Sequence, residues 1–423
     1  SVRSASFGGA SDKRFPLGIT NPMPPLRVYL DSSDYSVLSD PRRASPENKS
    51  VLQELRRLKN EGLVTIHFSG TLLSEMAPME PGFADVALRR ADLLVELCGR
   101  NALLSQERIF SFELRRAFGK ATDVESVYSN VGEWYPEGAA EISPITAVDM
   151  TSYIIEAIAE TGLNRKARRT AKRMALKSGN PRAAIKTALA VNARSGSLDE
   201  ILAKYPMRPE DARVLGRFVV GDATQAQASQ AFENSLRDPR WMMLWFEKHH
   251  TQLTPFIEWT RSPAKPFIAS LLEMADHAAA LRRQDSALGT DLTNSLLSST
   301  KWKEQQDSLL VRIAARFCTE FSVESAQLIS SSVLDENCPG LTVAVRSLHS
   351  AAWTVTSETP RKPKLSDFPD AMHAVYAPYV DVFRADSFMA PYISRHVSKH
   401  GTTTVSKLTN LPKAISEVLA ARE

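Results

Sequence analysis

The chain has 423 residues, of which 43% are hydrophobic and 24% are charged. These proportions are ordinary for a globular protein and exclude wholesale disorder, and the length suggests two or three domains. The formal net charge of +4 is too small to indicate a nucleic-acid partner by itself, so the distribution of charge along the chain matters more than its sum.

Other global features bear on where the protein works. No apolar run approaches the roughly 18 residues of a membrane-spanning helix, which predicts a soluble protein without a membrane partner. The first residues contain no hydrophobic segment typical of a secretory signal. Cys98, Cys318 and Cys338 are far apart and form no Cys-x-x-Cys pair, which favours a cytoplasmic location and argues against zinc.

The N-terminal part combines a loose tail with a strand. Residues 1–24 are rich in Ser, Gly and Pro and indicate a flexible tail. The apolar run 26–30 ends at Asp31, so we expect a buried strand followed directly by a carboxylate. Ser32 either offers its hydroxyl to the shell of a metal bound there or only turns the chain, and Asp34 is a loop residue or an outer-shell ligand of that metal.

A helix and a second strand follow. Ser45 and Pro46 predict a helix start, with serine as the N-cap and proline in the first position. Residues 63–69 predict the second strand, and the order strand, helix, strand implies a parallel crossover. Glu75 lies just beyond, where we expect it to open the next helix.

Residues 91–350 contain almost no strand pattern and predict a mostly α-helical insertion. Its most basic stretch begins at Arg165, and no acidic residue occurs between Glu160 and Asp199. Such a stretch can neutralise several phosphates of a nucleic acid, although a solvated basic helix face is the simpler interpretation. The candidate nucleic-acid-binding residues are Arg165, Lys166, Arg168, Arg169, Lys172 and Arg173.

Two further groups in the insertion favour structural roles. The aromatic residues Trp241, Trp245 and Phe246 have a helical spacing, so we expect them in a core rather than stacked on bases. Two histidines occur together at 249–250, and His277 follows a glutamate by four residues. Neither group has a third metal ligand at a recognisable spacing, which indicates surface histidines.

The C-terminal part contains an acidic stretch at 366–388. Asp367 and Asp370 lie at the start of a short helical pattern, and a strand predicted at 379–383 is followed by Asp386. Asp381, within that strand, is expected to pair with a basic residue. His373 lies one helical turn after Asp370, where it contacts a phosphate or a bound water, or more simply packs in the core.

Four acidic residues follow predicted elements in a fixed order. Asp31 follows the first strand, Glu75 lies in the helix after the second strand, Asp370 lies in a later helix, and Asp386 follows the next strand. This order resembles the PIN-domain nucleases. The resemblance covers about residues 25–90 and 350–415. It implies an α/β fold, a three-layer α/β/α domain with a central parallel sheet. The first half would be residues 25–90 and the second half residues 351–423, with the helical insertion 91–350 between them. A final strand at 402–408 and a closing helix at 412–421 complete the expected second half.

The resemblance also implies roles for the carboxylates. Converging carboxylates repel one another, and oxygen-preferring divalent cations such as Mg²⁺ or Mn²⁺ relieve the repulsion. Asp31 and Asp386 are then expected to hold the principal ion, and Asp370 to complete its shell directly or through water. Glu75 positions a second ion or the attacking water. Asp367 is the alternative helical ligand, although it suits an N-cap.

The implied function is a metal-dependent endonuclease. RNA is the preferred substrate because the family is rich in ribonucleases, including the toxins of bacterial toxin–antitoxin pairs. The insertion would select the substrate or bind a regulatory protein. Two alternatives stay open: a structure-specific DNA nuclease, and a non-catalytic helical interaction protein with a degenerate PIN-like domain, whose acidic residues are caps.

Overall fold

The computed structural model describes residues 23–77, 84–120, 122, 126–136, 150–177, 180–182, 207–219, 221–248, 264–291, 299–323, 329–356 and 367–422. The predicted tail therefore lies outside the described residues, except for positions 23 and 24. Within the described ranges, no helix combines the length and the apolar character needed to cross a membrane.

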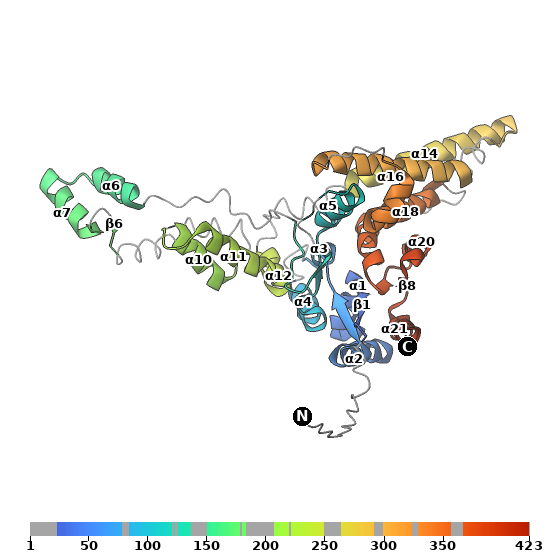
Figure 1. Ribbon diagram of the computed structural model, residues 1–423, viewed down its shortest axis with the longest axis horizontal. Coiled ribbons are helices and arrows are strands. Elements are labelled where there is room, and N and C mark those ends of the chain that lie inside the picture. Colours follow the sequence, from blue (N-terminus) through green and yellow to red (C-terminus); the bar gives the residue numbers. More distant parts are fainter. Residues whose placement is uncertain are drawn as a thin grey trace, which may run out of the picture.

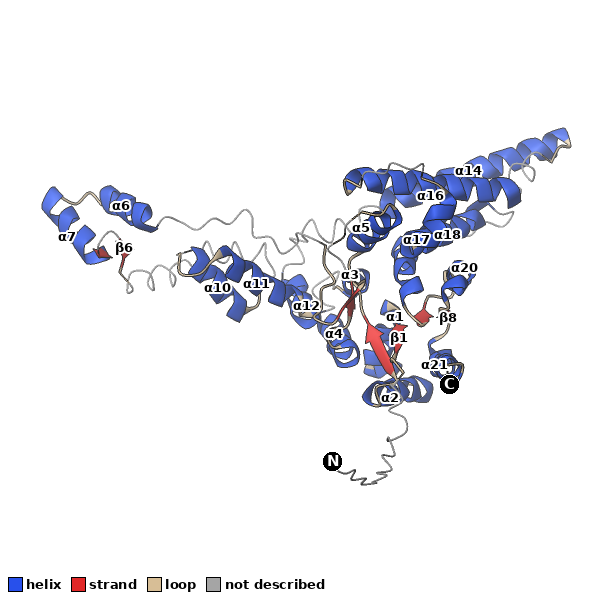
Figure 2. Ribbon diagram, in the orientation of Figure 1, coloured by secondary structure: helices blue, strands red, loops and turns tan. Residues whose placement is uncertain are grey.

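A four-stranded sheet lies at the centre of the molecule (Figure 2). Its strands, in the order β2-β1-β7-β8, are β1 (Leu26–Tyr29), β2 (Val64–His67), β7 (Val382–Arg384) and β8 (Thr403–Val405). All three pairings are parallel, which confirms the predicted α/β class and the parallel crossover between the first two strands. Strands of this kind are short and apolar because both faces of a parallel sheet are covered.

Helices cover both faces of the sheet. One face packs Val28, Ile66 and Val382 against the apolar sides of the helices α2 (Pro46–Asn60), α4 (Ala84–Cys98) and α21 (Leu411–Ala420). The other face packs Tyr29 and Phe383 against helices of the C-terminal half and the insertion. These helices are α5 (Gln106–Ala117), α16 (Ser299–Glu320), α17 (Ser331–Asn337), α18 (Pro339–Ala352) and α20 (Ala390–Val397).

The helix α2 forms as its sequence predicts. Ser45 is the N-cap and accepts a hydrogen bond from the backbone N–H of Asn48, and Pro46 occupies the first helical position. Val51, Leu55 and Leu58 are buried on one side, at the spacing of an amphipathic helix. Capping and burial thus fix the crossover that connects β1 to β2.

The third strand of the sheet lies later than the sequence predicted. Residues 379–383 were expected to form it, but the helix α19 (Asp367–His373) continues into the 3₁₀ helix η6 (Ala374–Tyr379), and β7 begins only at Val382. Pro378 lies inside η6. The α-helix ends at His373, five residues before this proline, and the short 3₁₀ helix tolerates the missing N–H.

The described part of the segment expected to be almost purely helical contains four short strands. They are β3 (Ala102–Leu103), β4 (Tyr128–Ser129), β5 (Leu176–Lys177) and β6 (Asn180–Pro181). A parallel bridge between Phe68 and Ala102 places β3 beside the end of β2, so this segment extends the central sheet. Strands of two residues are too short to show a hydrophobic alternation, which is why the sequence did not predict them.

The remaining described elements are mostly helical (Figure 1). In the N-terminal half they are α1 (Ser32–Ser39), η1 (Pro41–Arg43) and α3 (Gly70–Met76). In the insertion they are α6 (Met150–Glu160), α7 (Arg165–Ala175), α10 (Pro209–Val219), α11 (Gln225–Leu236), α12 (Pro239–Lys248) and α14 (Ala264–Leu288). The C-terminal part adds η5 (Trp353–Thr356), η7 (Ser398–His400) and η8 (Leu408–Asn410).

Candidate functional site

The carboxyl ends of β1 and β7 define the position of the candidate site. In the sheet, β2 is the neighbour of β1 on one side, whereas β7 and then β8 follow on the other side of β1. Such a reversal of strand order is a topological switch point, and open α/β sheets bind their ligands in the crevice beyond the strands at this point. Asp31 follows β1 and Asp386 follows β7, as the sequence predicted.

Asp31 is the N-cap of α1 and is buried, with an exposed fraction of 7%. Its Oδ1 accepts a hydrogen bond of 2.7 Å from the backbone N–H of Ser33, and its own N–H donates to Oδ2 of Asp34 at 3.0 Å. This capping box holds the carboxylate at the end of β1. Ser32 is the first residue of α1, so it starts the helix directly beside the site.

Asp386 has a similar local arrangement. Its Oδ1 accepts a 2.6 Å hydrogen bond from the N–H of Met389, and its Oδ2 accepts one of 3.2 Å from the N–H of Phe388. These residues precede α20, which begins at Ala390. Both strand-end aspartates are therefore oriented by backbone amides at the start of the following helix.

Asp370 brings the predicted carboxylates together. It lies in α19, and Asp367 is the first residue of that helix, with a side chain outside the described set. Burial, followed by the charges of Glu75 and Asp386, raises the pKa of Asp370 to about 8, and the charge of Asp31 acts in the same direction. The four candidate carboxylates therefore share one electrostatic environment, in which a proton or a cation relieves their mutual repulsion.

Glu75 does not open a helix as expected. Ser69 caps α3 by accepting a hydrogen bond from the N–H of Leu72, so the helix begins at Gly70 and Glu75 is its penultimate residue. A serine followed by glycine is a stronger start signal than the later glutamate. The position in the last turn places Oε2 of Glu75 3.0 Å from Nε2 of His373.

His373 is buried, with an exposed fraction of 4%, which confirms the packed histidine favoured from the sequence. Its Nδ1 lies 2.7 Å from the hydroxyl of Tyr29, and that hydroxyl is 2.6 Å from Oγ of Ser69. Burial lowers the pKa of His373, but the charges of Glu75, Asp31 and Asp370 outweigh burial and raise the pKa to about 9. The raised pKa of this packed histidine favours its protonated form beside the carboxylates.

Asp34 is not the loop residue that the sequence suggested. It lies in α1 with an exposed fraction of 1%, and its Oδ1 is 3.2 Å from Nη2 of Arg384. Burial raises the pKa of Asp34 to about 7 and outweighs the opposing attraction of Arg384. We therefore assign Asp34 to a buried ion pair that joins α1 to β7 beneath the site.

Sequence reasoning missed three residues of this region: Tyr29, Ser69 and Arg384. Tyr29 lies in a buried strand and looks like any aromatic core residue, so nothing in the sequence marked its hydroxyl. Ser69 precedes a glycine at a strand end and could have been recognised as a helix cap. Arg384 lies two positions before Asp386, next to a predicted apolar strand. A charged residue in such a place is seldom buried without a partner, and this was the signal that could have identified it.

The candidate ligands for a divalent cation are the carboxylates of Asp31, Glu75, Asp370 and Asp386. Carboxylate oxygens are the ligands that Mg²⁺ and Mn²⁺ prefer, and the raised pKa of Asp370 reflects the excess negative charge that a cation balances. Within the described ranges, however, no group of three or more His, Cys, Asp or Glu side chains is arranged so that it could hold a metal ion. The chemistry of the donors fits a hard cation, while Asp31 and Asp386 are oriented as hydrogen-bonded caps and Glu75 contacts His373.

The predicted nucleic-acid-binding residues form the exposed face of α7. All six basic side chains from Arg165 to Arg173 are exposed, and Asn164 caps the helix by accepting a hydrogen bond from Ala167. Figure 1 shows α6 and α7 together at one end of the molecule, away from β1. The structure therefore does not bring this basic surface to the carboxylates.

The other sequence-derived expectations concern residues away from the site. Trp245 and Phe246 are buried, with exposed fractions of 4% and 1%, as expected for core residues. His277 is exposed, whereas the histidines at 249–250 lie outside the described residues. Asp381 lies just before β7 rather than within it, and its Oδ1 is 2.5 Å from Nη2 of Arg422, which confirms pairing with a basic residue.

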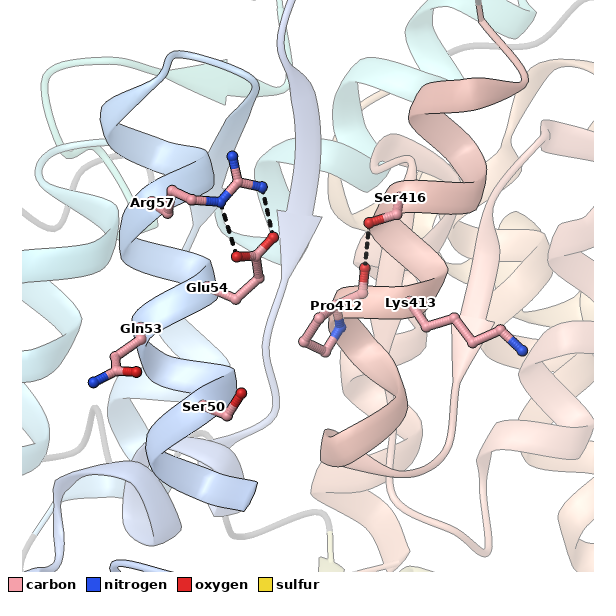
Figure 3. Close-up of a pocket in the computed structure, with 7 residues that line it drawn as sticks. All are labelled: Ser50, Gln53, Glu54, Arg57, Pro412, Lys413 and Ser416. Atoms are coloured by element: carbon pink, nitrogen blue, oxygen red, sulfur yellow. Dashed lines mark hydrogen bonds and ion pairs between the residues drawn. The ribbon is translucent and has the colours of Figure 1, made fainter. Parts of the chain in front are cut away.

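Figure 3 shows a groove between α2 and α21. Its volume is about 380 Å³, and its lining is Ser50, Gln53, Glu54, Arg57, Pro412, Lys413 and Ser416. Arg57 already donates two hydrogen bonds to Glu54, so its guanidinium is engaged. None of the candidate carboxylates lines this groove.

The chain was compared with protein-family models, with curated proteins and with solved structures. None of them matched it.

Proposed function

We propose that this protein is a metal-dependent endonuclease with a PIN-like domain, and that RNA is its substrate. The observation that carries the proposal is the environment of Asp370, whose carboxyl group is influenced by the charges of Glu75, Asp386 and Asp31. These residues come from four separate elements and gather at a switch point of a parallel sheet, where catalytic sites of open α/β folds lie.

The residues have distinct roles in this proposal. Asp31, Asp370 and Asp386 would hold Mg²⁺ or Mn²⁺, which supplies an activated water and a counter-charge for the leaving oxygen of a phosphodiester. The amide hydrogen bonds at Asp31 and Asp386 orient their carboxylates at the strand ends. No nucleophilic side chain is required, because water is the attacking group.

The choice of RNA rests on the resemblance to a family rich in ribonucleases. The exposed basic face of α7 supports a nucleic-acid substrate, because an acidic catalytic centre repels phosphates and needs positive surface elsewhere on the protein. A toxin or defence role of the kind found in toxin–antitoxin pairs, with a regulatory protein bound to the helical insertion, extends the same proposal.

The decisive experiment is cleavage of labelled single-stranded RNA, structured RNA and DNA with Mg²⁺ or Mn²⁺, by the wild type and by Asp31→Asn and Asp386→Asn. We expect cleavage of RNA that EDTA stops and that both variants lose although they remain folded. Asp85→Asn is the matched control, because Asp85 is exposed on α4 and is not among the charges that raise the pKa of Asp370. It should cleave like the wild type.

The other outcomes decide between the alternatives. Cleavage of DNA alone, with the same dependence on metal and on the two aspartates, would identify a DNA nuclease. Full activity in Asp31→Asn would contradict the proposed site. If no polymer is cut or bound and charge reversal on α7 changes nothing, the carboxylates are caps in an interaction protein.

A further inference from the structure

A continuous chain of polar contacts runs beneath the candidate site. It connects Ser69 to the hydroxyl of Tyr29 at 2.6 Å, that hydroxyl to Nδ1 of His373 at 2.7 Å, and Nε2 of His373 to Glu75 at 3.0 Å. Tyr29 and Ser69 have exposed fractions of 0%, and His373 of 4%. Because these groups are buried, the loss of one of these hydrogen bonds is not readily compensated by water and destabilises the arrangement.

Each residue in this series of polar contacts lies in or next to an element that also carries a candidate carboxylate. Tyr29 lies two residues before Asp31 on the same strand segment, and His373 lies three residues after Asp370, on the same face of α19. Ser69 caps α3, the helix of Glu75. These polar contacts therefore connect β1, α3 and α19 close to the candidate carboxylates of each element.

Aromatic packing fixes the direction of the central hydroxyl. The ring of Tyr29 stacks on Phe383 at 5.3 Å with an interplanar angle of 8°, and on Tyr376 at 5.6 Å with an angle of 21°. The ring of His373 lies 5.7 Å away at an angle of 56°. Stacking on two rings and complete burial restrict the phenol ring and favour one direction for its hydroxyl, toward His373.

The helix α19 needs such an anchor. It has seven residues and passes directly into η6, and helices of this length are not stable on their own in water. Its position, and with it that of Asp370, is set by contacts with neighbouring elements. His373 supplies a contact to β1 and a contact to α3 at once.

We propose that His373 is a positioning residue: through Tyr29 and Glu75 it fixes α19 and α3 against β1, so that Asp370 and Glu75 face Asp31 in the geometry that the reaction needs. This inference rests on the proposed nuclease function. It also assigns Glu75 a partner, so that Glu75 acts in the orientation imposed by His373 and not as an independent ligand.

Two substitutions of similar size separate the contacts of His373. In His373→Gln the amide nitrogen lies near the position of Nε2 and still donates to Glu75. In His373→Asn the amide lies near the position of Nδ1, reaches Tyr29 and loses Glu75. Replacement of His277, which is exposed on α14, by asparagine is the matched control.

The measurements are Mn²⁺ affinity of the full-length protein by electron paramagnetic resonance, and kcat and KM for RNA cleavage. We expect His373→Asn to weaken Mn²⁺ binding or lower kcat by about 10- to 100-fold, with little change in KM. His373→Gln should retain most of the Mn²⁺ affinity and most of the kcat of the wild type. Glu75→Gln added to His373→Asn should cause little further loss, because the two residues act as one unit.

The outcomes distinguish this inference from the function on which it rests. If the wild type cleaves RNA and both His373 variants match it, or both decline only in proportion to their thermal stability, His373 is a packing residue and the inference fails alone. A wild type that neither binds Mn²⁺ nor cleaves RNA contradicts the proposed function, and the role of His373 falls with it.

Discussion

The ion pair between Asp34 and Arg384 connects the two halves of the sheet beneath the candidate site. Asp34 belongs to α1, Arg384 belongs to β7, and their exposed fractions are 1% and 8%. Asp34 also accepts the backbone N–H of Asp31, so one buried carboxyl group supports both the ion pair and the cap. Its contribution to stability depends on whether both partners stay together in the interior.

Removing the carboxyl group alone should be costly. In Asp34→Ala the guanidinium of Arg384 stays buried without its partner, so we expect the free energy of unfolding to fall by about 3 kcal/mol, measured by chemical denaturation. Glu417→Ala is the control, because its ion pair with Lys413 is exposed and should contribute less than about 1 kcal/mol. Equal effects of the two substitutions would show that the buried pair adds nothing.

At the scale of single elements, α5 and α18 are joined by one carboxyl group. Glu113 of α5 accepts hydrogen bonds from the backbone N–H groups of Gly340 at 2.5 Å and Leu341 at 3.0 Å, at the start of α18. The hydroxyl of Tyr379 donates to the same carboxyl group. The interaction satisfies backbone amides that the first turn of a helix leaves without partners.

The close approach at Gly340 predicts a strong steric effect. A Cβ atom at this position would lie 2.9 Å from both Oε1 of Glu113 and the carbonyl oxygen of Val375. We expect Gly340→Ala to lower the free energy of unfolding by about 2 kcal/mol, as overpacking does elsewhere. Gly216→Ala should be neutral or stabilising, because Gly216 is helical and nothing lies within 4 Å of its Cβ position.

Glu113 also predicts how stability varies with pH. Burial raises the pKa of Glu113 to about 7, above the value of 4.5 in an unfolded chain, so the folded state binds the proton more tightly. Its contribution is therefore fully present below about pH 4.5 and is lost as pH rises through about 7, a change of at most about 3 kcal/mol.

Unfolding measured at several pH values checks this expectation. Glu113→Gln cannot ionise, so the difference in unfolding free energy between wild type and variant should shift in favour of the variant as pH rises from 5 to 8. A difference that stays constant over this range would show that Glu113 has the same pKa in the folded and unfolded states.

The elements that the sequence predicted best are those with strong local signals. Ser45 and Pro46 marked the start of α2, apolar runs marked β1 and β2, and a run rich in β-branched residues marked β8, each within a few residues. Asp31 and Asp386 were placed correctly because each follows such a run. Glu75 was placed at the wrong end of its helix, since the cap at Ser69 was overlooked. The links through Tyr29 and Arg384 depend on contacts across more than 300 positions of sequence, which no local pattern contains.

At the scale of the whole molecule, the basic face of α7 and the acidic site are separate regions. If α7 contacts RNA phosphates, Arg168→Glu combined with Arg169→Glu should weaken binding and reduce the slope of log affinity against log salt by about 1 to 2. Binding of a single-stranded RNA without added metal, between about 50 and 200 mM salt, measures this. Lys49→Glu with Lys413→Glu is the control, since both lysines are exposed on α2 and α21. Equal slopes in both double variants would exclude α7 as the contact surface.

The central sheet unites strands from opposite ends of the chain, and Arg27 and Asp381, which share a hydrogen bond, are 354 positions apart. A ribosome must therefore synthesise more than 350 further residues after β1 before β7 can join it. Until then Asp31 and Glu75 exist without Asp370 and Asp386, and the site cannot form in a nascent chain. A product of translation interrupted before β7 would likewise lack the site, so any activity that resides there requires both halves of the sheet.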